Sequence, residues 1–179
     1  CTAAGDAPWL GGATALRIAY RRRLLALAAR DLSGHSSFSE VTHELAHLAD
    51  AVLAACLELA RCELPADAAP CRIAIVSMGK CGGQELNYIS DVDVIFVAEP
   101  GEPPDGTLAD EDEALQTATL LARGVMRAAN DSTPEGSIWE VDAALRPEGK
   151  AGALVRTLAS HVGYYERWAQ TWEYQALLK

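Results

Sequence analysis

The stretch SMGKCGGQELNYISDVDVIF, residues 77–96, decides the fold of this chain. It joins two apolar, β-branched segments, RIAIVSM (72–78) and DVDVIFVA (91–98), which predict two buried strands with a glycine-rich connection between them. Asp91 and Asp93 stand two residues apart where the second strand begins. Because side chains alternate along a strand, both carboxylates point to one face and the intervening valine points to the core.

Two neighbouring carboxylates repel each other, and a hard divalent cation bound between them removes that cost. Mg²⁺ prefers one or two protein carboxylates together with phosphate oxygens, so the pair predicts a magnesium–nucleotide site. Residues 138–146 (IWEVDAALR) alternate apolar and polar and predict a third strand, with Asp142 on its polar face. Beside the second strand, Asp142 would complete a cluster for two ions. A short DxD pattern also fits two solvated aspartates at the mouth of a strand.

The glycines of the connection favour close approach of the backbone to a ligand. The amide groups of Gly79, Gly82 and Gly83 are suited to a triphosphate. The segment is not a Walker A loop, because Lys80 is followed by Cys81 rather than by Ser or Thr, and it is not GxGxxG. We interpret the cysteine as a small apolar filler.

Three cations lie near these elements in the sequence: Lys80, Arg146 and Lys150. Each is suited to neutralising phosphate charge. A surface role fits each of them equally well, so the sequence leaves these alternatives open.

The chain before the first strand predicts a helical hairpin. Apolar residues recur at three- and four-residue spacing over 13–31, with most arginines off that stripe, after a breaker-rich start (1–12) that predicts a loop. Ser37 and Glu40 have the form of a capping box and open a second amphipathic helix.

The small, polar break at 65–70 is the best boundary in the sequence. We expect residues 1–64 to form an N-terminal helical segment and 65–179 a catalytic domain, truncated at its C-terminal end. Within the second part, 110–130 predicts a helix, and 157–179 predicts further helix with a break near Gly163. That helix runs to the last residue without a stop signal, so we expect a chain cut from a longer one.

Composition favours a globular protein that binds neither nucleic acid nor membrane. Half of the 179 residues are hydrophobic, and 25 acidic against 15 basic residues give a net charge of −10, which repels a phosphate backbone. A leader and a long apolar run are both missing from the sequence, which predicts a cytoplasmic protein. The five cysteines form no CxxC pair and are predicted to be free thiols: Cys1, Cys56, Cys62, Cys71 and Cys81.

The segment from His43 to His47, HELAH, matches the H-E-x-x-H zinc motif of metallopeptidases. Its third ligand is missing, because Asp50 and Leu53 stand where the extended motif needs glycine and a metal ligand. The apolar residues of this segment belong to the hairpin stripe. We therefore predict that the two histidines lie on the flank of a helix.

Two blocks of the sequence resemble the glutamine synthetase adenylyltransferase/adenylyl-removing enzyme family. Residues 77–96 match its G-K-x-G-G-x-E-L…S-D-x-D-[LV]-I-F block, and 138–152 match V-D-x-x-L-R-P-x-G-x-x-G. Trp172-Glu173 followed by Ala176-Leu177 is similar to its W-E-x-x-A-L continuation. The blocks fall in the family's order, and the resemblance spans residues 17–179.

The resemblance implies an α+β fold of the polymerase-β-like nucleotidyltransferase type, a mixed sheet with flanking helices preceded here by the helical hairpin. It implies that Asp91, Asp93 and Asp142 are catalytic and hold two Mg²⁺ ions. It further implies a nucleotide site for ADP or ATP, formed by Gly79, Lys80, Gly82, Gly83, Ser90 and Arg146, with support from Glu85. Two departures from the family's commonest form are Cys81, where leucine is usual, and Ala144, where arginine is usual.

The segment 85–88 (ELNY) and the preceding arginine-rich helix look more like the N-terminal, adenylyl-removing half of the family. That half implies phosphorolysis of AMP-tyrosine on glutamine synthetase to give ADP. The alternatives are ATP-dependent adenylylation of the same tyrosine and a non-catalytic nucleotide-binding fragment. The family also implies a PII signalling protein as a partner, which no residue of this sequence locates.

Overall fold

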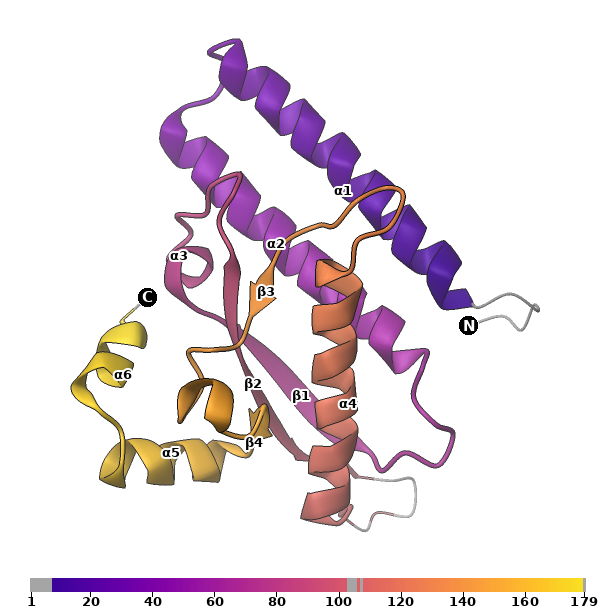
Figure 1. Ribbon diagram of the computed structural model, residues 1–179, viewed down its shortest axis with the longest axis vertical. Coiled ribbons are helices and arrows are strands. Elements are labelled where there is room, and N and C mark those ends of the chain that lie inside the picture. Colours follow the sequence, from indigo (N-terminus) through magenta and orange to yellow (C-terminus); the bar gives the residue numbers. More distant parts are fainter. Residues whose placement is uncertain (1–7, 103–105, 107, 179) are drawn as a thin grey trace.

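A computed structural model of the chain describes residues 8–102, 106 and 108–178, with the side chains of 8–10 left aside. Helices pack on a mixed, open sheet, so the predicted α+β class is confirmed (Figure 1). The elements of the described residues are α1 (Pro8–Leu32), α2 (Phe38–Arg61), β1 (Cys71–Ser77), α3 (Gly79–Gly82), β2 (Val92–Pro100), α4 (Glu111–Asn130), β3 (Val141–Asp142), the 3₁₀ turn η1 (Gly149–Ala151), β4 (Val155–Arg156), α5 (Leu158–Arg167) and α6 (Thr171–Ala176).

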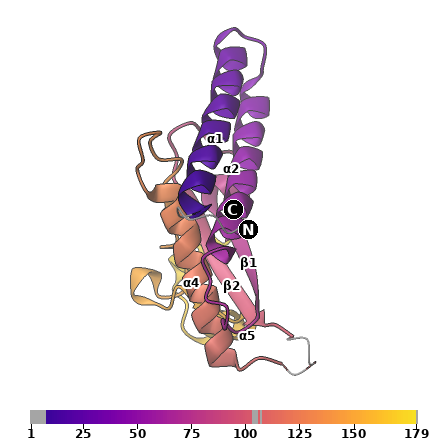
Figure 2. The same cartoon turned by 90° about the vertical axis from the view of Figure 1, so that its right-hand side faces the viewer.

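Strand β2 is the centre of the sheet. It pairs antiparallel with β1 along the whole length of β1, and parallel with the two-residue strands β3 and β4. Val92, Val94 and Phe96 of β2 are buried on one face, as their alternation predicts. Helices α2 and α4 cover that face (Figures 1 and 2), so the side chains between these residues lie on the opposite face.

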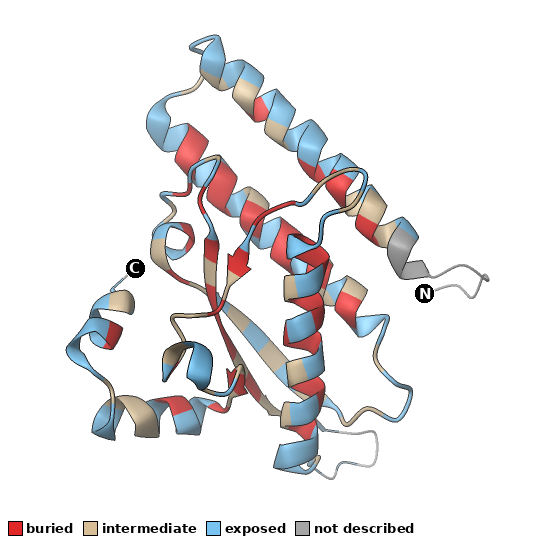
Figure 3. Cartoon of the chain, viewed as in Figure 1, coloured by how far each residue is buried: buried red, intermediate tan, exposed pale blue. Residues whose placement is uncertain are grey.

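The helical hairpin forms as predicted. Ser37 Oγ accepts from the Glu40 amide at 3.3 Å, and the Glu40 carboxylate accepts from the Ser37 amide at 2.8 Å, which completes the capping box. The buried stripe of α2 packs against both α1 and α4 (Figure 3). The hydrophobic core therefore runs from the hairpin into the sheet, and the division at 65–70 stays a prediction.

Helix α1 begins at Pro8, so the predicted loop over 1–12 is wrong for its last five residues, while residues 1–7 lie outside the described part. Proline is tolerated in the first turn of a helix, where its missing amide hydrogen has no partner to lose. Gly12 lies close to α2, since a Cβ there would lie 2.5 Å from Leu59 Cδ2 and would require that side chain to shift.

Arg17 is fully buried, although the sequence pattern placed it with the polar side of α1. Its guanidinium donates to the carbonyl oxygens of Ala13 (3.2 Å), Ala128 (2.9 Å), Asp131 (2.6 Å) and Gly136 (2.8 Å). Two of these carbonyls belong to the C-terminal end of α4, where they lack helical partners and carry the negative end of the helix dipole. Arg17 thus ties α1 to α4 and to the turn that leads into β3.

Two local predictions were wrong. The third strand was expected over 138–146 but pairs only at Val141–Asp142, because the chain then bends into a turn in which the Arg146 amide donates to Ala143 O. Gly163 does not break the last helix; α5 continues through it, and the interruption follows Arg167. The glycine connection contains a single helical turn, α3.

The cysteine prediction holds in part. Cys56, Cys71 and Cys81 are free, and Cys81 is the buried apolar filler that we expected. Cys62 is disulfide-bonded, which corrects the free-thiol prediction for that residue. It stands at the C-cap of α2, where its side chain is exposed rather than enclosed by the core. Cys1 lies outside the described residues.

Replacing Arg17 tests whether its four hydrogen bonds stabilise the fold. Arg17→Met should lower the free energy of unfolding by about 3 kcal/mol or more, because it leaves buried carbonyl groups without donors. Urea unfolding followed by circular dichroism measures this change. Arg22→Met, at an exposed position of the same helix, should change it by less than about 0.5 kcal/mol. Equal effects of the two substitutions would contradict the assignment.

Candidate functional site

The parallel pairing of β2 with β3 places two of the predicted catalytic aspartates side by side. Asp93 stands opposite Asp142, and Val92 stands opposite Val141. The Val92 amide donates to Glu140 O at 2.8 Å, which fixes this register. Because Val92 and Val141 are buried in the core, both carboxylates lie on the other face of the sheet.

Asn130, the last residue of α4, holds β3 in this position. Its side-chain amide donates to Val141 O at 3.2 Å, and its carbonyl oxygen accepts from Val141 N–H at 2.8 Å. The amide group therefore substitutes for a further strand at the free edge of β3. Sequence reasoning missed Asn130, and only its place at the end of the helical pattern 110–130 marked it.

Helical turn α3 closes over Asp93 from the other side. The Met78 amide donates to Asp93 O at 2.8 Å, and Gly79 follows with φ of +55°. A Cβ on Gly79 would lie 2.7 Å from Asp93 Oδ2, so only glycine lets the carboxylate lie this close to the backbone. The Gly82 and Gly83 amides donate to Met78 O and Gly79 O within the turn, rather than facing a ligand as the sequence suggested.

The remaining residues of the predicted nucleotide site lie around this turn. Lys80 Nζ donates to the buried Ser90 hydroxyl at 3.3 Å, which links α3 to the start of β2. Asp91 is exposed at that start. Glu85 is also exposed, and its amide donates to Lys80 O at 2.7 Å. The structure thus brings Asp91, Lys80 and Ser90 near Asp93, as the resemblance implied.

Arg146 lies in the turn after β3, and its guanidinium is occupied by backbone groups. Its nitrogens donate to the carbonyl oxygens of Ala143 (2.8 Å), Lys150 (3.0 Å) and Gly152 (3.1 Å). The ammonium of Lys150 lies 3.6 Å from Asp142 Oδ2. The cation nearest Asp142 in this arrangement is therefore Lys150.

The electrostatics of the carboxylates favour binding of a cation. Burial raises the pKa of Asp93, the charges of Asp91 and Asp142 raise it further, and Lys80 lowers it. Asp142 Oδ1 accepts from the Ala144 amide at 2.8 Å. In the described part of the chain, no three His, Cys, Asp or Glu side chains are already arranged as metal ligands. The donor set consists of carboxylate oxygens, which suits a hard ion such as Mg²⁺.

The H-E-x-x-H segment lies on α2, and both of its histidines are exposed on the flank of the hairpin, as predicted. His43 Nδ1 is 2.7 Å from Ser39 O, and His47 Nε2 is 3.5 Å from the side-chain nitrogen of Gln84. The described residues around them supply no third ligand in metal-binding geometry, so the zinc interpretation has no support.

Comparison with known proteins agrees with the resemblance. The model of the glutamate-ammonia ligase adenylyltransferase family matches residues 11–179. A bifunctional glutamine synthetase adenylyltransferase/adenylyl-removing enzyme from Streptomyces avermitilis is 60% identical over 164 residues. Enzymes of the same name from Cutibacterium acnes and Mycolicibacterium smegmatis are each 52% identical over 167 and 170 residues.

A mixed sheet that carries neighbouring aspartates on two parallel strands is consistent with a nucleotidyltransferase-like protein. The chain belongs to the glutamate-ammonia ligase adenylyltransferase family. Each of these alignments covers 92% of this chain but only 15–16% of the relative, so the chain spans about a sixth of their length. None of the helices in the described residues is long and apolar enough to cross a membrane.

Neutralising Asp93 should stabilise the metal-free protein. Because the pKa of Asp93 is raised in the folded state, its ionised form costs stability at neutral pH, and this cost disappears as the pH falls through the raised pKa. Asp93→Asn should therefore raise the thermal midpoint at pH 7 without Mg²⁺, and the gain should shrink toward pH 4. Calorimetric scans at both pH values measure this difference, and a midpoint below that of the wild type at pH 7 would contradict the prediction.

Replacing Gly79 should disturb the carboxylate without unfolding the chain. Gly79→Ala places a methyl group against Asp93 Oδ2 at a positive φ, so Mg²⁺ affinity should fall about tenfold or more. Gly163→Ala is the matched control, since α5 leaves open space around that position and alanine favours a helix. Titration calorimetry with MgCl₂ compares the two variants, and equal affinities would refute the role of Gly79.

Proposed function

We propose that this chain carries the magnesium-dependent site of an adenylyl-removing enzyme that acts on glutamine synthetase. The observation that supports this function is the register in which Asp93 faces Asp142 on a parallel neighbour, with Asp91 two residues earlier. The names of the relatives, which state both adenylyl transfer and adenylyl removal, support the substrate class. Glutamine synthetase is the proposed protein substrate, and no described surface is assigned to PII.

Each residue of the site has a proposed role. Asp91 and Asp93 would hold both Mg²⁺ ions, and Asp142 would help to hold the ion that serves the nucleophile. Mg²⁺ bound there would lower the charge of the phosphate oxygens and orient the attacking group. Lys80, Ser90 and the backbone of Gly79 form the proposed nucleotide-binding part, while Gly82 and Gly83 close the turn that positions them. Arg146 contributes by shaping the turn beside Asp142.

The proposed reaction is a displacement at the α-phosphorus. An oxygen of inorganic phosphate forms a bond to the phosphorus of AMP-tyrosine, while the bond from that phosphorus to the tyrosine oxygen breaks. The new phosphoric anhydride is ADP, and the released phenolate takes a proton to give tyrosine. Phosphate is already ionised at pH 7, so the protein needs no strong base in this direction.

The opposite direction remains the alternative. Adenylylation would need deprotonation of a tyrosine hydroxyl with a pKa near 10, which would require help from Asp142 or from a bound metal ion. The segment 85–88 and the preceding helix favour the removing direction. A non-catalytic nucleotide-binding domain is the second alternative.

Phosphate-dependent ADP release from adenylylated glutamine synthetase tests the proposal. The chain should release ADP in the presence of Mg²⁺ and phosphate, and it should not label unmodified glutamine synthetase from ATP. Asp142→Asn should slow ADP release by about 100-fold, because it removes a proposed metal ligand. High-performance liquid chromatography of the nucleotides measures both reactions.

Asp91→Ala/Asp93→Ala is the control for contaminating activity and should be inactive. Labelling from ATP without ADP release would show that the direction is adenylylation. Inactivity in both assays, with nucleotide binding unchanged in the double variant, would refute the catalytic proposal in favour of a binding domain.

A further inference from the structure

The three cations near the site in the sequence differ in the contacts that their side chains make in the structure. Arg146 has its guanidinium engaged by three backbone carbonyl groups of its own turn. Lys80 donates to Ser90 on the side of α3. The side chain of Lys150 is 78% exposed, and its ammonium has a single pairing distance, 3.6 Å to Asp142 Oδ2. An exposed pair of this length is weak, so Lys150 is free to exchange its partner.

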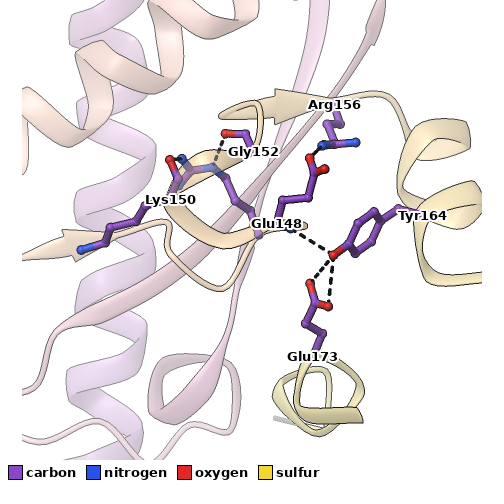
Figure 4. Close-up of polar contacts among 7 residues, drawn as sticks. Glu148, Lys150, Gly152, Arg156, Tyr164 and Glu173 are labelled. Atoms are coloured by element: carbon purple, nitrogen blue, oxygen red, sulfur yellow. Dashed lines mark hydrogen bonds and ion pairs between the residues drawn. The ribbon is translucent and has the colours of Figure 1, made fainter. Parts of the chain in front are cut away.

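The backbone of the turn presents Lys150 to the site. Arg146 fills the inside of the turn, since its guanidinium joins the carbonyls of Ala143, Lys150 and Gly152. A Cβ on Gly152 would lie 2.1 Å from Pro147 O, so the turn closes only around glycine. Figure 4 shows the Lys150 side chain extending from the turn, away from Tyr164 and Glu173.

The turn contains a residue in an unfavourable conformation. Glu148 has φ of +63°, a left-handed value that costs a residue with a Cβ free energy. Two outside contacts stabilise it: its amide donates to Tyr164 Oη at 3.3 Å, and its carboxylate pairs with Arg156. These contacts hold the turn in the one conformation that carries Lys150 toward Asp142.

Tyr164 is fixed in turn by the last helix (Figure 4). Its hydroxyl donates to the carboxylate of Glu173, with oxygen distances of 2.8 and 3.1 Å. Glu173 is only 2% exposed and also accepts from the Gln170 amide at 2.7 Å. A chain of contacts therefore runs from α6 through α5 to the turn that bears Lys150.

We propose that Lys150 is a phosphate-binding residue of this site, and that Tyr164 and Glu173 are positioning residues that act through it. The inference rests on the proposed function, because it needs a phosphate beside Asp142. A divalent cation held by Asp142 would repel the ammonium of Lys150, which would then be free to pair with a phosphate oxygen of a bound nucleotide. Lys150 thus exchanges a carboxylate partner for a phosphate partner when Mg²⁺ and nucleotide bind.

Binding of Mg²⁺–ADP and of Mg²⁺ alone distinguishes a phosphate-binding role of Lys150 from a merely structural one. Lys150→Gln should weaken binding of Mg²⁺–ADP by about 10- to 100-fold, because it removes a charge-assisted contact. The same variant should bind Mg²⁺ alone more tightly than the wild type, because a competing cation has left Asp142. A general disturbance of the site would weaken both. Isothermal titration calorimetry on the full chain measures both affinities.

Matched variants control for charge and for folding. Arg22→Gln on α1 makes the same change in net charge and should bind Mg²⁺–ADP within twofold of the wild type. Lys150→Arg keeps the positive charge and should retain most of the affinity. If Lys150→Gln binds Mg²⁺–ADP like the wild type, or weakens Mg²⁺ and Mg²⁺–ADP equally, the phosphate role is wrong.

A double-mutant cycle tests the positioning role. Tyr164→Phe removes the hydroxyl between Glu148 and Glu173 but keeps the ring, and it should weaken Mg²⁺–ADP several-fold. In the Lys150→Gln background it should cause little further loss, since the contact that it positions is gone. Additive losses would show that Tyr164 acts independently of Lys150 and would overturn this part of the proposal.

The failure of this inference is distinguishable from the failure of the proposed function. If the wild type does not bind Mg²⁺–ADP, or if Asp91→Ala/Asp93→Ala binds it equally well, the proposed function is refuted. If that double variant loses binding while Lys150→Gln keeps it, the function stands and only the role of Lys150 is refuted.

Discussion

The parallel pairing of β2 with β3 is the constraint on which the site depends. It forces the carboxylates of Asp93 and Asp142 onto one face of the sheet, where their mutual repulsion costs free energy. The pairing persists because Val92 and Val141 are buried on the other face and because Asn130 satisfies both backbone groups of Val141. Apolar packing and two hydrogen bonds thus hold together what the charges would separate, and a bound cation would turn this repulsion into attraction.

The sequence predicted those features that follow from periodicity. Apolar, β-branched runs located β1 and β2, alternation along the strand assigned Asp91 and Asp93 to one face, and helical spacing with a capping box located the hairpin. Periodicity does not show with which other strand a strand pairs, or over how many residues. The length of β3 was therefore not predictable. The alternating pattern of 138–146 indicates burial on one side, whereas strand pairing ends at Asp142 because Ala143 O accepts a hydrogen bond within the following turn.

Residues with long polar side chains were the least predictable, because their charge and position in the sequence do not show which groups they contact. Arg17 was assigned to the polar side of a helix, yet it is buried and bonded to carbonyls more than a hundred residues away. From charge and position in the sequence alone, Arg146 and Lys150 were both candidates for phosphate, and the family resemblance implied a nucleotide-binding role only for Arg146. Only the contacts distinguish them, because the guanidinium of Arg146 donates to backbone carbonyls inside a turn while the ammonium of Lys150 is exposed.

The segment Trp172-Glu173 is connected in the structure to the turn that follows β3. Alone, a glutamate on a short terminal helix has no evident purpose, and its burial would be costly. In the structure its carboxylate fixes Tyr164, the tyrosine hydroxyl supports the strained Glu148, and the turn around Arg146 carries Lys150 to Asp142. These contacts connect the last helix to the carboxylate site, although the two are separated in the sequence.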